Sequence, residues 1–231
     1  MQEVYQFLID YCIGWYLEYN PEYLLELSNG KRKMPLTDKK DILTKCIYGV
    51  DIDIHAVEVS KFSLLIKLIE DETPASVREY VPILPDLGLN IRNGNSLISR
   101  EDLGNDNISF ELLCGIKPFR WQDINEGYKF DVIIGNPPYV KTEDMHTLDS
   151  ENEFNIYKKK YKSAYKQFDK YFLFVEKAFD LLKCDGKLCY IIPNKFYKIE
   201  AGKELRRLFA PYIAQLDDFG DMQLFLTKRF T

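Results

Sequence analysis

Residues 131 to 139 join an apolar strand to a rigid polar turn, and this junction constrains the fold more than any other stretch of the chain. Residues 132 to 134 read Val-Ile-Ile, a run that is typical of a strand buried on both faces of a parallel sheet. Proline cannot donate to a strand ladder, so Pro137 is expected to end the strand. Asn136 then lies at the strand's carboxyl end, where open α/β sheets bind their ligands.

The turn Asn136-Pro137-Pro138-Tyr139 combines stiff hydrogen-bond acceptors with an aromatic ring. Each proline fixes its own φ and restricts the residue before it. The side-chain oxygen of Asn136 and the carbonyl oxygen of Pro137 can accept the two hydrogens of an exocyclic or amide NH₂, while Tyr139 covers its face. Accepting both hydrogens favours a pyramidal nitrogen that attacks a methyl donor in line. The alternative is a plain strand-ending turn, because Asn-Pro and Pro-Pro are common in loops.

These residues resemble a signature of the S-adenosylmethionine-dependent amino-methyltransferases, especially the N6-adenine DNA methyltransferases of restriction-modification systems of the type IIG kind. The resemblance covers nearly the whole chain. A second signature of that family matches residues 48 to 58, Tyr-Gly-Val-Asp-Ile-Asp followed by Ala-Val-Glu after two residues. The resemblance implies that Asp51 binds the cofactor ribose and that Ile52 lies against the cofactor adenine. Asp53 is better explained as the N-cap of a helix that starts near His55.

Two further signatures of the family have counterparts in this chain. The first spans residues 91 to 97 and implies that Asn95 and Ser96 bind the cofactor, although family members usually carry an acid at the position of Asn95. The Asn95 oxygen can still accept a hydrogen bond from the adenine amine, and a bland turn is the alternative. The last signature spans residues 217 to 225 and implies that Phe225 stacks on a flipped-out adenine. The alternative for Phe225 is an ordinary core aromatic residue.

The family's glycine-rich cofactor loop has no counterpart in this chain, since residues 1 to 9 read as the helix that follows that loop. Gly14 lies inside a helical pattern and cannot substitute for the loop. The resemblance therefore implies a fragment or split product whose first central strand is missing, with the strands that end at Asp51 and Asn136 left partly uncovered. We expect the isolated chain to bind S-adenosylmethionine poorly and to need a complementing chain that carries the glycine loop and the recognition domain.

The alternation of strand and helix patterns predicts an α/β fold, a doubly wound Rossmann-like methyltransferase sheet lacking its first central strand. Residues 1–231 are expected to form a single partial catalytic domain. The remaining expectations are helices at 4–19, 55–70, 167–183 and 200–210, strands near Ile47, Ile91, Val132, Leu188 and Ile213, and loops at 29–40, 101–128 and 140–166, the last two being insertions. The aromatic residues of the third helix are expected to lie mostly in the core.

A basic run lies between the catalytic turn and the third helix. Residues 157 to 166 contain five lysines interleaved with three tyrosines and no acid. Such a run can contact phosphates and stack on displaced bases, which makes DNA-binding candidates of Lys158, Lys159, Lys160 and Lys162. A solvated surface loop is the alternative interpretation.

Composition narrows the class of protein further. Hydrophobic residues make up 46% and charged residues 29% of the 231 positions, which is typical of a folded globular chain. The apolar runs are too short for a membrane span, and no signal pattern opens the chain. The five cysteines are scattered and odd in number, so neither disulfides nor a zinc site is expected. These features favour a cytoplasmic enzyme without a metal.

The sequence therefore predicts methylation of adenine N6 in double-stranded DNA, with the target base flipped out toward Asn136 and Pro137. Methyl transfer to a protein glutamine or an RNA base amine is an alternative within the class, because those enzymes share the same turn. Cytosine N4 enzymes usually carry Ser or Asp in place of Asn136. A different class of function is a non-catalytic remnant or a split subunit that folds only with a complementing chain.

Overall fold

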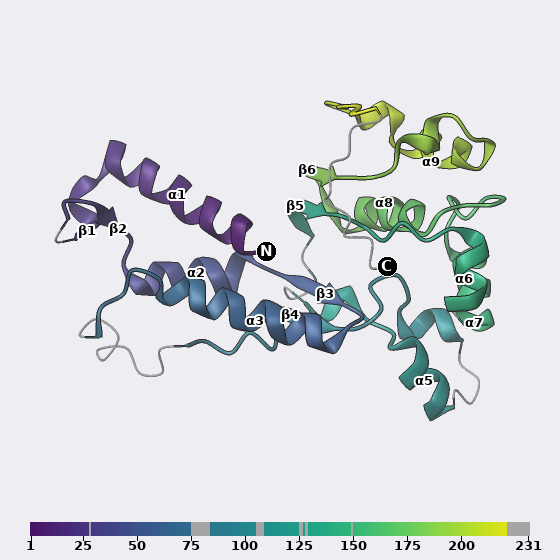
Figure 1. Cartoon of the computed structure of the whole chain (residues 1–231), viewed down its shortest axis with the longest axis horizontal. Helices are drawn as coiled ribbons and strands as arrows, with labels where there is room; N and C mark the ends of the chain where they lie inside the picture. Colours follow the sequence, from purple (N-terminus) through teal and green to yellow (C-terminus); the bar gives the residue numbers. More distant parts are fainter. Residues whose placement is uncertain are drawn as a thin grey trace, which may run out of the picture. The chain divides into compact units, whose positions relative to one another are not determined.

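A computed structural model of the chain describes residues 1–27, 29–74, 84–104, 109–124, 127, 129–148 and 150–220 (Figure 1). The chain divides into two compact units. Unit 1 comprises Met1–Ser99 and Lys117–Tyr128, and unit 2 comprises Arg100–Ile116 and Lys129–Thr231.

Unit 1 contains three helices longer than one turn and two short pairs of strands in its described part. In chain order its elements are α1 (Gln2–Tyr19), η1 (Pro21–Tyr23), β1 (Leu25–Glu26), β2 (Arg32–Lys33), α2 (Leu36–Cys46), β3 (Gly49–Asp51), α3 (Ile54–Ile69), β4 (Ile91–Asn93) and η3 (Trp121–Asp123). Strands β1 and β2 pair antiparallel, whereas β3 and β4 pair parallel in the register Val50 to Arg92.

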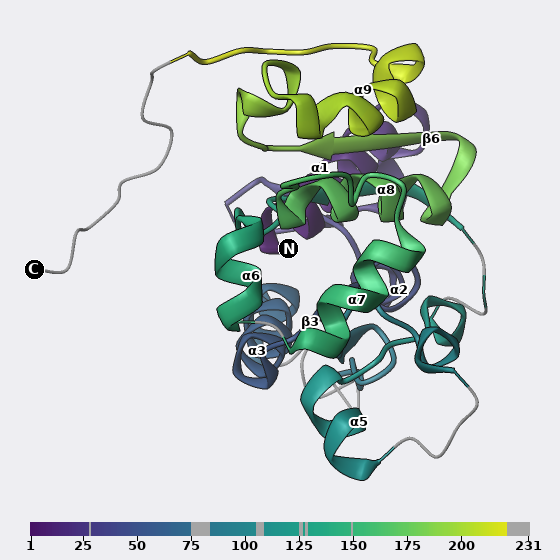
Figure 2. The ribbon, with the colours of Figure 1, turned by 90° about the vertical axis from the view of Figure 1, so that its right-hand side faces the viewer.

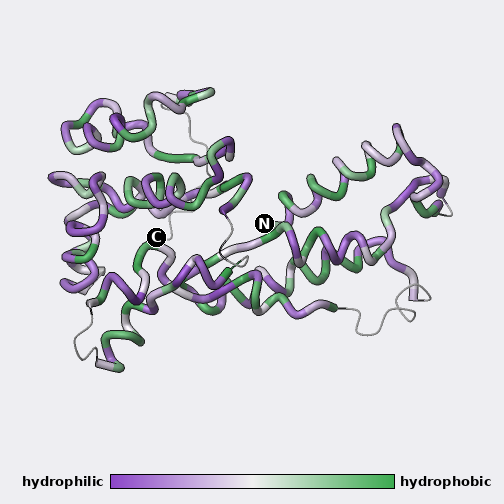
Figure 3. The backbone as a smooth tube through the Cα atoms, turned by 180° about the vertical axis from the view of Figure 1, so that it is seen from behind, coloured by the Kyte–Doolittle hydropathy of each residue, from purple (hydrophilic) through white to green (hydrophobic). Residues whose placement is uncertain are grey.

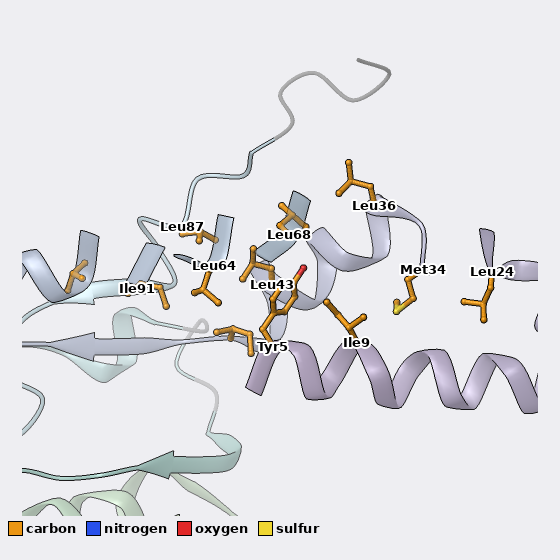
Figure 4. Packing of buried hydrophobic residues seen from close by; sticks show 12 residues of the cluster. Tyr5, Ile9, Leu24, Met34, Leu36, Leu43, Leu64, Leu68, Leu87 and Ile91 are labelled. Carbon is orange, nitrogen blue, oxygen red and sulfur yellow. The ribbon is translucent and has the colours of Figure 1, made fainter. Parts of the chain in front are cut away.

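The core of unit 1 lies where α1, α2 and α3 meet (Figure 4). Tyr5 of α1, Leu43 of α2 and Leu64 and Leu68 of α3 are completely buried and point toward one another. The Tyr5 hydroxyl donates to the Lys39 carbonyl oxygen at 2.9 Å, so the buried phenol keeps a hydrogen-bond partner. Apolar residues one helical turn apart thus place three helices around a single core.

A buried carboxylate fastens the segment after α3 to the elements before it. Glu72, whose side chain is 2% exposed, contacts the ammonium groups of Lys33 and Lys39 at 2.7 Å each. Two cations therefore compensate one buried anion. Removing one partner of such a group leaves charge uncompensated in a poorly solvated site.

We expect Glu72→Gln to lower the free energy of unfolding by about 2 kcal/mol, because two lysines would then lack a nearby anion. Urea denaturation followed by circular dichroism measures the change. The matched control is Glu58→Gln on α3, because the Glu58 side chain is 62% exposed in its pair with Lys61 and such surface pairs contribute about 0.5 kcal/mol. Equal losses in both variants would contradict this account.

Unit 2 is built around a long parallel strand pair and the helix that directly precedes its second strand. Its elements are η2 (Arg100–Leu103), α5 (Phe110–Ile116), β5 (Phe130–Gly135), α6 (Thr142–Leu148), α7 (Glu151–Lys160), α8 (Lys170–Leu181), β6 (Leu182–Tyr190), η5 (Asn194–Tyr197), η6 (Glu200–Gly202), α9 (Lys203–Phe209) and η7 (Ala210–Tyr212). Figure 2 shows α8 beside β6, with α9 beyond the strand.

Helix α8 supplies five residues to the core of unit 2. Tyr171, Phe172, Leu173, Val175 and Ala178 are all buried. The expectation that the aromatic residues of this helix lie mostly in the core is confirmed for Tyr171 and Phe172, whereas Phe174 and Phe179 are partly exposed. The tube coloured by hydropathy in Figure 3 shows hydrophobic segments alternating with hydrophilic ones along the helices of the chain.

The fold class is α/β with small parallel sheets. In the described residues the strands form three two-stranded sheets, and neither β3–β4 nor β5–β6 has a third strand. Val132 and Ile134 of β5 are 53% and 58% exposed. Parallel strands normally have both faces covered. This pair of strands instead leaves much of the apolar side-chain surface of β5 exposed.

Three segments expected to be loops contain helices. Residues 29–40 include β2 and the start of α2, residues 101–128 include α5, and residues 140–166 include α6 and α7. Helix α2 buries Leu36, Lys39 and Leu43 on one face. This helical spacing was not recognised in the sequence because turn-forming residues come before it. Helix α7 begins with a capping box between Ser150 and Glu153, a recognisable start signal.

Two further expectations at element boundaries are wrong. The segment after η7 forms no strand at Ile213 among residues 213–220, because no neighbouring strand pairs with it there. The helix expected to reach Lys183 ends at Leu181. Strand β6 begins at Leu182, because Leu182 pairs with Phe130. In both cases strand pairing, a tertiary interaction, decides the outcome.

None of the helices in the described residues is both long and apolar enough to cross a membrane. No group of three or more His, Cys, Asp or Glu side chains in the same residues is arranged to hold a metal ion.

Candidate functional site

The turn after β5 lies at the carboxyl end of the parallel pair. Strand β5 ends at Gly135, opposite Tyr190 of β6, so Asn136 is the first residue beyond the ladder. The Tyr139 hydroxyl contacts the side-chain oxygen of Asn136 and the carbonyl oxygen of Ile191, the latter at 2.9 Å. Asn136 is exposed, Pro137 is buried and Tyr139 is 45% exposed. The turn therefore presents a polar group and a ring to solvent while its backbone is anchored.

A second tyrosine from α8 supports the Tyr139 ring. The rings of Tyr139 and Tyr171 meet edge to face with centroids 6.3 Å apart, a geometry that aromatic pairs prefer. The Tyr171 hydroxyl donates to the Pro193 carbonyl oxygen at 3.1 Å. Burial raises the pKa of both phenols, so both hydroxyl groups carry their protons at neutral pH.

The start of α8 anchors the chain that follows the turn. The Lys170 backbone amide donates to the Val140 carbonyl oxygen at 2.8 Å, and the Thr142 hydroxyl donates to the Phe168 carbonyl oxygen at 2.5 Å. Asp169, which is 4% exposed, pairs with the Lys195 ammonium group at 2.6 Å. These contacts tie the segment after the turn to α8 and the segment after β6.

In unit 1, Asp51 and Ile52 lie at the carboxyl end of β3. One oxygen of Asp51 accepts from the Asp53 backbone amide at 2.8 Å; the described residues give the second oxygen no hydrogen bond or ion pair. The Asn93 side-chain amide donates to the carbonyl oxygens of Asp51 and Ile52 at 3.0 Å each. Asp53 accepts from the His55 backbone amide at 2.9 Å, so its expected role as N-cap is confirmed.

Asn95 and Ser96 belong to a tight turn after β4. The Asn95 side-chain oxygen accepts from the Leu97 backbone amide at 3.1 Å, and Asn95 is 6% exposed. The Ser96 carbonyl oxygen accepts a hydrogen bond from the Trp121 indole at 2.9 Å, which gives Trp121 a structural role. Asn95 therefore has a structural task, and its binding to a cofactor stays a prediction.

The basic run begins as the last turn of α7. Lys160 pairs with Asp102, and the Lys158 ammonium group donates to the Lys166 carbonyl oxygen at 3.0 Å. Lysines at a helix carboxyl end also compensate the helix dipole. Lys159 and Lys162 are exposed, and no ion pair of either side chain occurs among the described residues.

The sequence-predicted residues thus fall into two groups. Asp51, Ile52, Asn95 and Ser96 come together in unit 1, and Asn136 to Tyr139 lie in unit 2 with the lysines. Phe225 lies outside the described residues. Sequence reasoning missed the supporting Tyr171, the Ile191 carbonyl group and the pair of Asp169 with Lys195. The sequence signal for these residues was that Asp169 and Tyr171 lie within 167–183, which was expected to be a helix.

An α/β chain with this turn at the end of a parallel strand has the features of a methyltransferase. The chain belongs to the Eco57I restriction-modification methylase family, which matches residues 45–225. That family is one of restriction-modification methylases.

Three curated relatives support the same class. The chain is 45% identical over 228 residues to the type II restriction enzyme and methyltransferase RM.Eco57I of Escherichia coli, covering 98% of this chain and 22% of that protein. It is 38% identical over 88 residues to the type II methyltransferase M.BstVI of Geobacillus stearothermophilus, covering 38% of this chain and 15% of that protein. It is 29% identical over 106 residues to the type II methyltransferase M.XhoI of Xanthomonas vasicola, covering 45% of this chain and 19% of that protein. The chain thus spans less than a quarter of these relatives.

Proposed function

We propose that this chain contributes to adenine-N6 methylation of double-stranded DNA with S-adenosylmethionine, as part of a restriction-modification system. The observation that carries the proposal is the turn at Asn136, where an exposed amide follows directly on a parallel strand and precedes an exposed tyrosine ring. The family and its type II relatives imply a DNA substrate. The choice of adenine N6 rests on Asn136 at the first position of the turn.

The turn has the groups that methylation of a planar amine requires. The Asn136 side-chain oxygen and the Pro137 carbonyl oxygen accept the two N–H hydrogens of the amine, which localises its lone pair on nitrogen. The exposed face of Tyr139 stacks on a base that has left the duplex. S-adenosylmethionine supplies an electrophilic methyl group when it is bound. The residues of this chain hold the amine and its ring in place for that transfer.

Asp51 and Ile52 fit a nucleoside part of the cofactor. The second carboxylate oxygen of Asp51 is available at the end of β3, where a carboxylate can accept hydrogen bonds from ribose hydroxyls. Ile52 is 49% exposed, which leaves apolar surface for an adenine ring. We propose Asn95 and Ser96 as neighbours of that ring.

A methylation assay tests the function. The full chain is incubated with plasmid DNA and S-adenosylmethionine labelled in its methyl group, and the digested nucleosides are separated by mass spectrometry. Label in N6-methyladenine is the expected result. Label in N4-methylcytosine would overturn the choice of base. Label transferred to RNA or to a protein glutamine, with none in DNA, would favour the alternative substrates within the class.

The exposed strand β5 favours a second candidate function. Val132 and Ile134 present apolar surface on a pair of strands that is too narrow to bury them. In this alternative the chain acts together with a complementing chain, which supplies a strand beside β5 and covers these residues. Methylation that appears only after coexpression with such a fragment supports this alternative. Absence of methylation in both cases would favour a non-catalytic remnant.

We expect the double substitution Lys159→Glu and Lys162→Glu to weaken DNA binding about tenfold at about 0.1 M salt, because two phosphate contacts are lost and two repulsions are added. Fluorescence anisotropy with a labelled duplex measures the affinity. The control is Lys45→Glu with Lys61→Glu, which makes the same change of charge in unit 1. Equal weakening in both pairs would show that only net charge matters and would remove the lysine run from the DNA interface.

A further inference from the structure

The Tyr139 hydroxyl oxygen contacts two oxygen atoms as the side chains are placed. One is the Asn136 side-chain oxygen, and the other is the Ile191 carbonyl oxygen at 2.9 Å. Each of these two oxygens accepts hydrogen bonds and has no proton to donate. A protonated phenol has one proton and can satisfy only one of them.

One of the two contacts therefore has no hydrogen atom between its two oxygen atoms. Such a contact is repulsive at hydrogen-bond distance. Turning the Asn136 side-chain amide by 180° exchanges its oxygen and nitrogen, which have nearly the same shape and are assigned from the hydrogen-bond network. The amide nitrogen then donates to the Tyr139 oxygen, and the Tyr139 hydroxyl donates to Ile191. Both contacts are then satisfied.

We propose that Tyr139 is a positioning residue, which accepts a hydrogen bond from the Asn136 amide nitrogen and donates its own proton to the Ile191 carbonyl group. This chain of two bonds directs the Asn136 oxygen away from Tyr139. The oxygen is then free to accept a hydrogen from the target amine. The catalytic consequence rests on the proposed function, whereas the orientation of the amide does not.

The Ile191 carbonyl group is suited to this role by its position in the fold. Ile191 follows β6 directly, and its backbone amide donates to the Gly135 carbonyl oxygen at 3.3 Å. The carbonyl group is thereby held at the end of the ladder, and the described hydrogen bonds give it no donor other than Tyr139. The Tyr139 hydroxyl donates its only proton to this fixed backbone acceptor, so the Tyr139 oxygen can act only as an acceptor toward Asn136.

The same arrangement separates two tasks of Tyr139. Its ring supplies a face for a base and rests against Tyr171, which a phenylalanine would also provide. Its hydroxyl sets the orientation of Asn136, which a phenylalanine cannot provide. Tyr139→Phe therefore removes the orienting bond and leaves the ring. Tyr171→Phe is the matched control, since it removes a hydroxyl that donates to the Pro193 backbone at 3.1 Å and not to Asn136.

Nuclear magnetic resonance of the side-chain amides tests the orientation without requiring activity. The Asn136 signals are assigned by their loss in Asn136→Asp, and hydrogen exchange of the two amide protons is measured in the full chain. We expect one proton to be protected in the wild type and in Tyr171→Phe, and exchange at least about fivefold faster in Tyr139→Phe, as loss of one hydrogen bond predicts. Equal exchange in the wild type and Tyr139→Phe would overturn the proposal.

Kinetics test the catalytic consequence. We expect Tyr139→Phe to lower kcat about tenfold with KM for DNA unchanged, because an orienting bond acts on the reacting amine, and Tyr171→Phe to retain kcat. A raised KM with unchanged kcat would assign the hydroxyl to binding and overturn the positioning role. If the wild-type chain methylates no substrate, the exchange experiment alone decides the orientation, and the proposed function fails separately.

Discussion

Asn136→Ala is expected to lower the rate of DNA methylation by about 10²–10³-fold, the usual loss when one preorganised group at a reacting centre is removed. The amide oxygen is one of two acceptors proposed for the target amine, and alanine leaves Pro137 as the only one. Because Asn136 is exposed, we expect the free energy of unfolding to change by less than about 0.5 kcal/mol. Initial rates with labelled S-adenosylmethionine measure the first effect, and urea denaturation measures the second.

The matched control for this variant is Asn155→Ala, which removes the same group from an exposed position on α7. Its methylation rate should equal that of the wild type. Retention of half or more of the activity in Asn136→Ala would rule out the amide as an acceptor for the substrate. A parallel loss of activity and stability would instead assign Asn136 to the fold.

Gly202→Ala is expected to destabilise unit 2 by about 4 kcal/mol or more, at the upper end for single substitutions. Gly202 is buried. A Cβ atom there would overlap the Phe196 carbonyl oxygen and lie 2.8 Å from the Phe196 carbonyl carbon. Backbone atoms cannot move aside as a flexible side chain can, so the segment from η5 to α9 must shift. The unfolding midpoint in urea should fall accordingly.

Gly14→Ala provides the matched control because the same atom is added in open space. Apart from its chain neighbours and the nearby backbone of its own helix, no atom lies within 4 Å of a Cβ at Gly14, which occupies the interior of α1. Alanine in a helix interior is about 0.5–1 kcal/mol more favourable than glycine, so this variant should be more stable than the wild type. A loss of less than about 1 kcal/mol in Gly202→Ala would show that the turn after η5 adapts easily.

Local sequence signals predicted the elements that carry strong periodicity or caps. The long helices α1 and α3 and the strands β3 and β5 are where their patterns placed them, with Asp53 at the start of α3. Helix α2 was missed because Pro35 and its polar neighbours suggested a turn, although proline is compatible with a helix start. The loop patterns around α6 and α7 misled for the same reason, since polar surface helices resemble loops in composition.

The element boundaries that were predicted wrongly from the sequence depend on strand pairing between distant residues. Leu182 joins β6 because it pairs with Phe130, 52 positions earlier in the chain, and no local pattern contains that partner. Ile213 has a strand-like sequence, yet the described residues give it no neighbouring strand. Strand formation requires a partner, whereas a helix satisfies its own backbone.

The sequence by itself determined the chemistry of the turn at Asn136, because rigid prolines, an amide and an aromatic ring are properties of four consecutive residues. It also placed Asp51 at the end of its strand. Only the tertiary structure decided how the turn is supported: Tyr171 comes from α8 and the Ile191 carbonyl group from the end of β6. These contacts join residues far apart in the chain, so the support of the turn follows from the packing of unit 2 and not from the four residues of the turn alone.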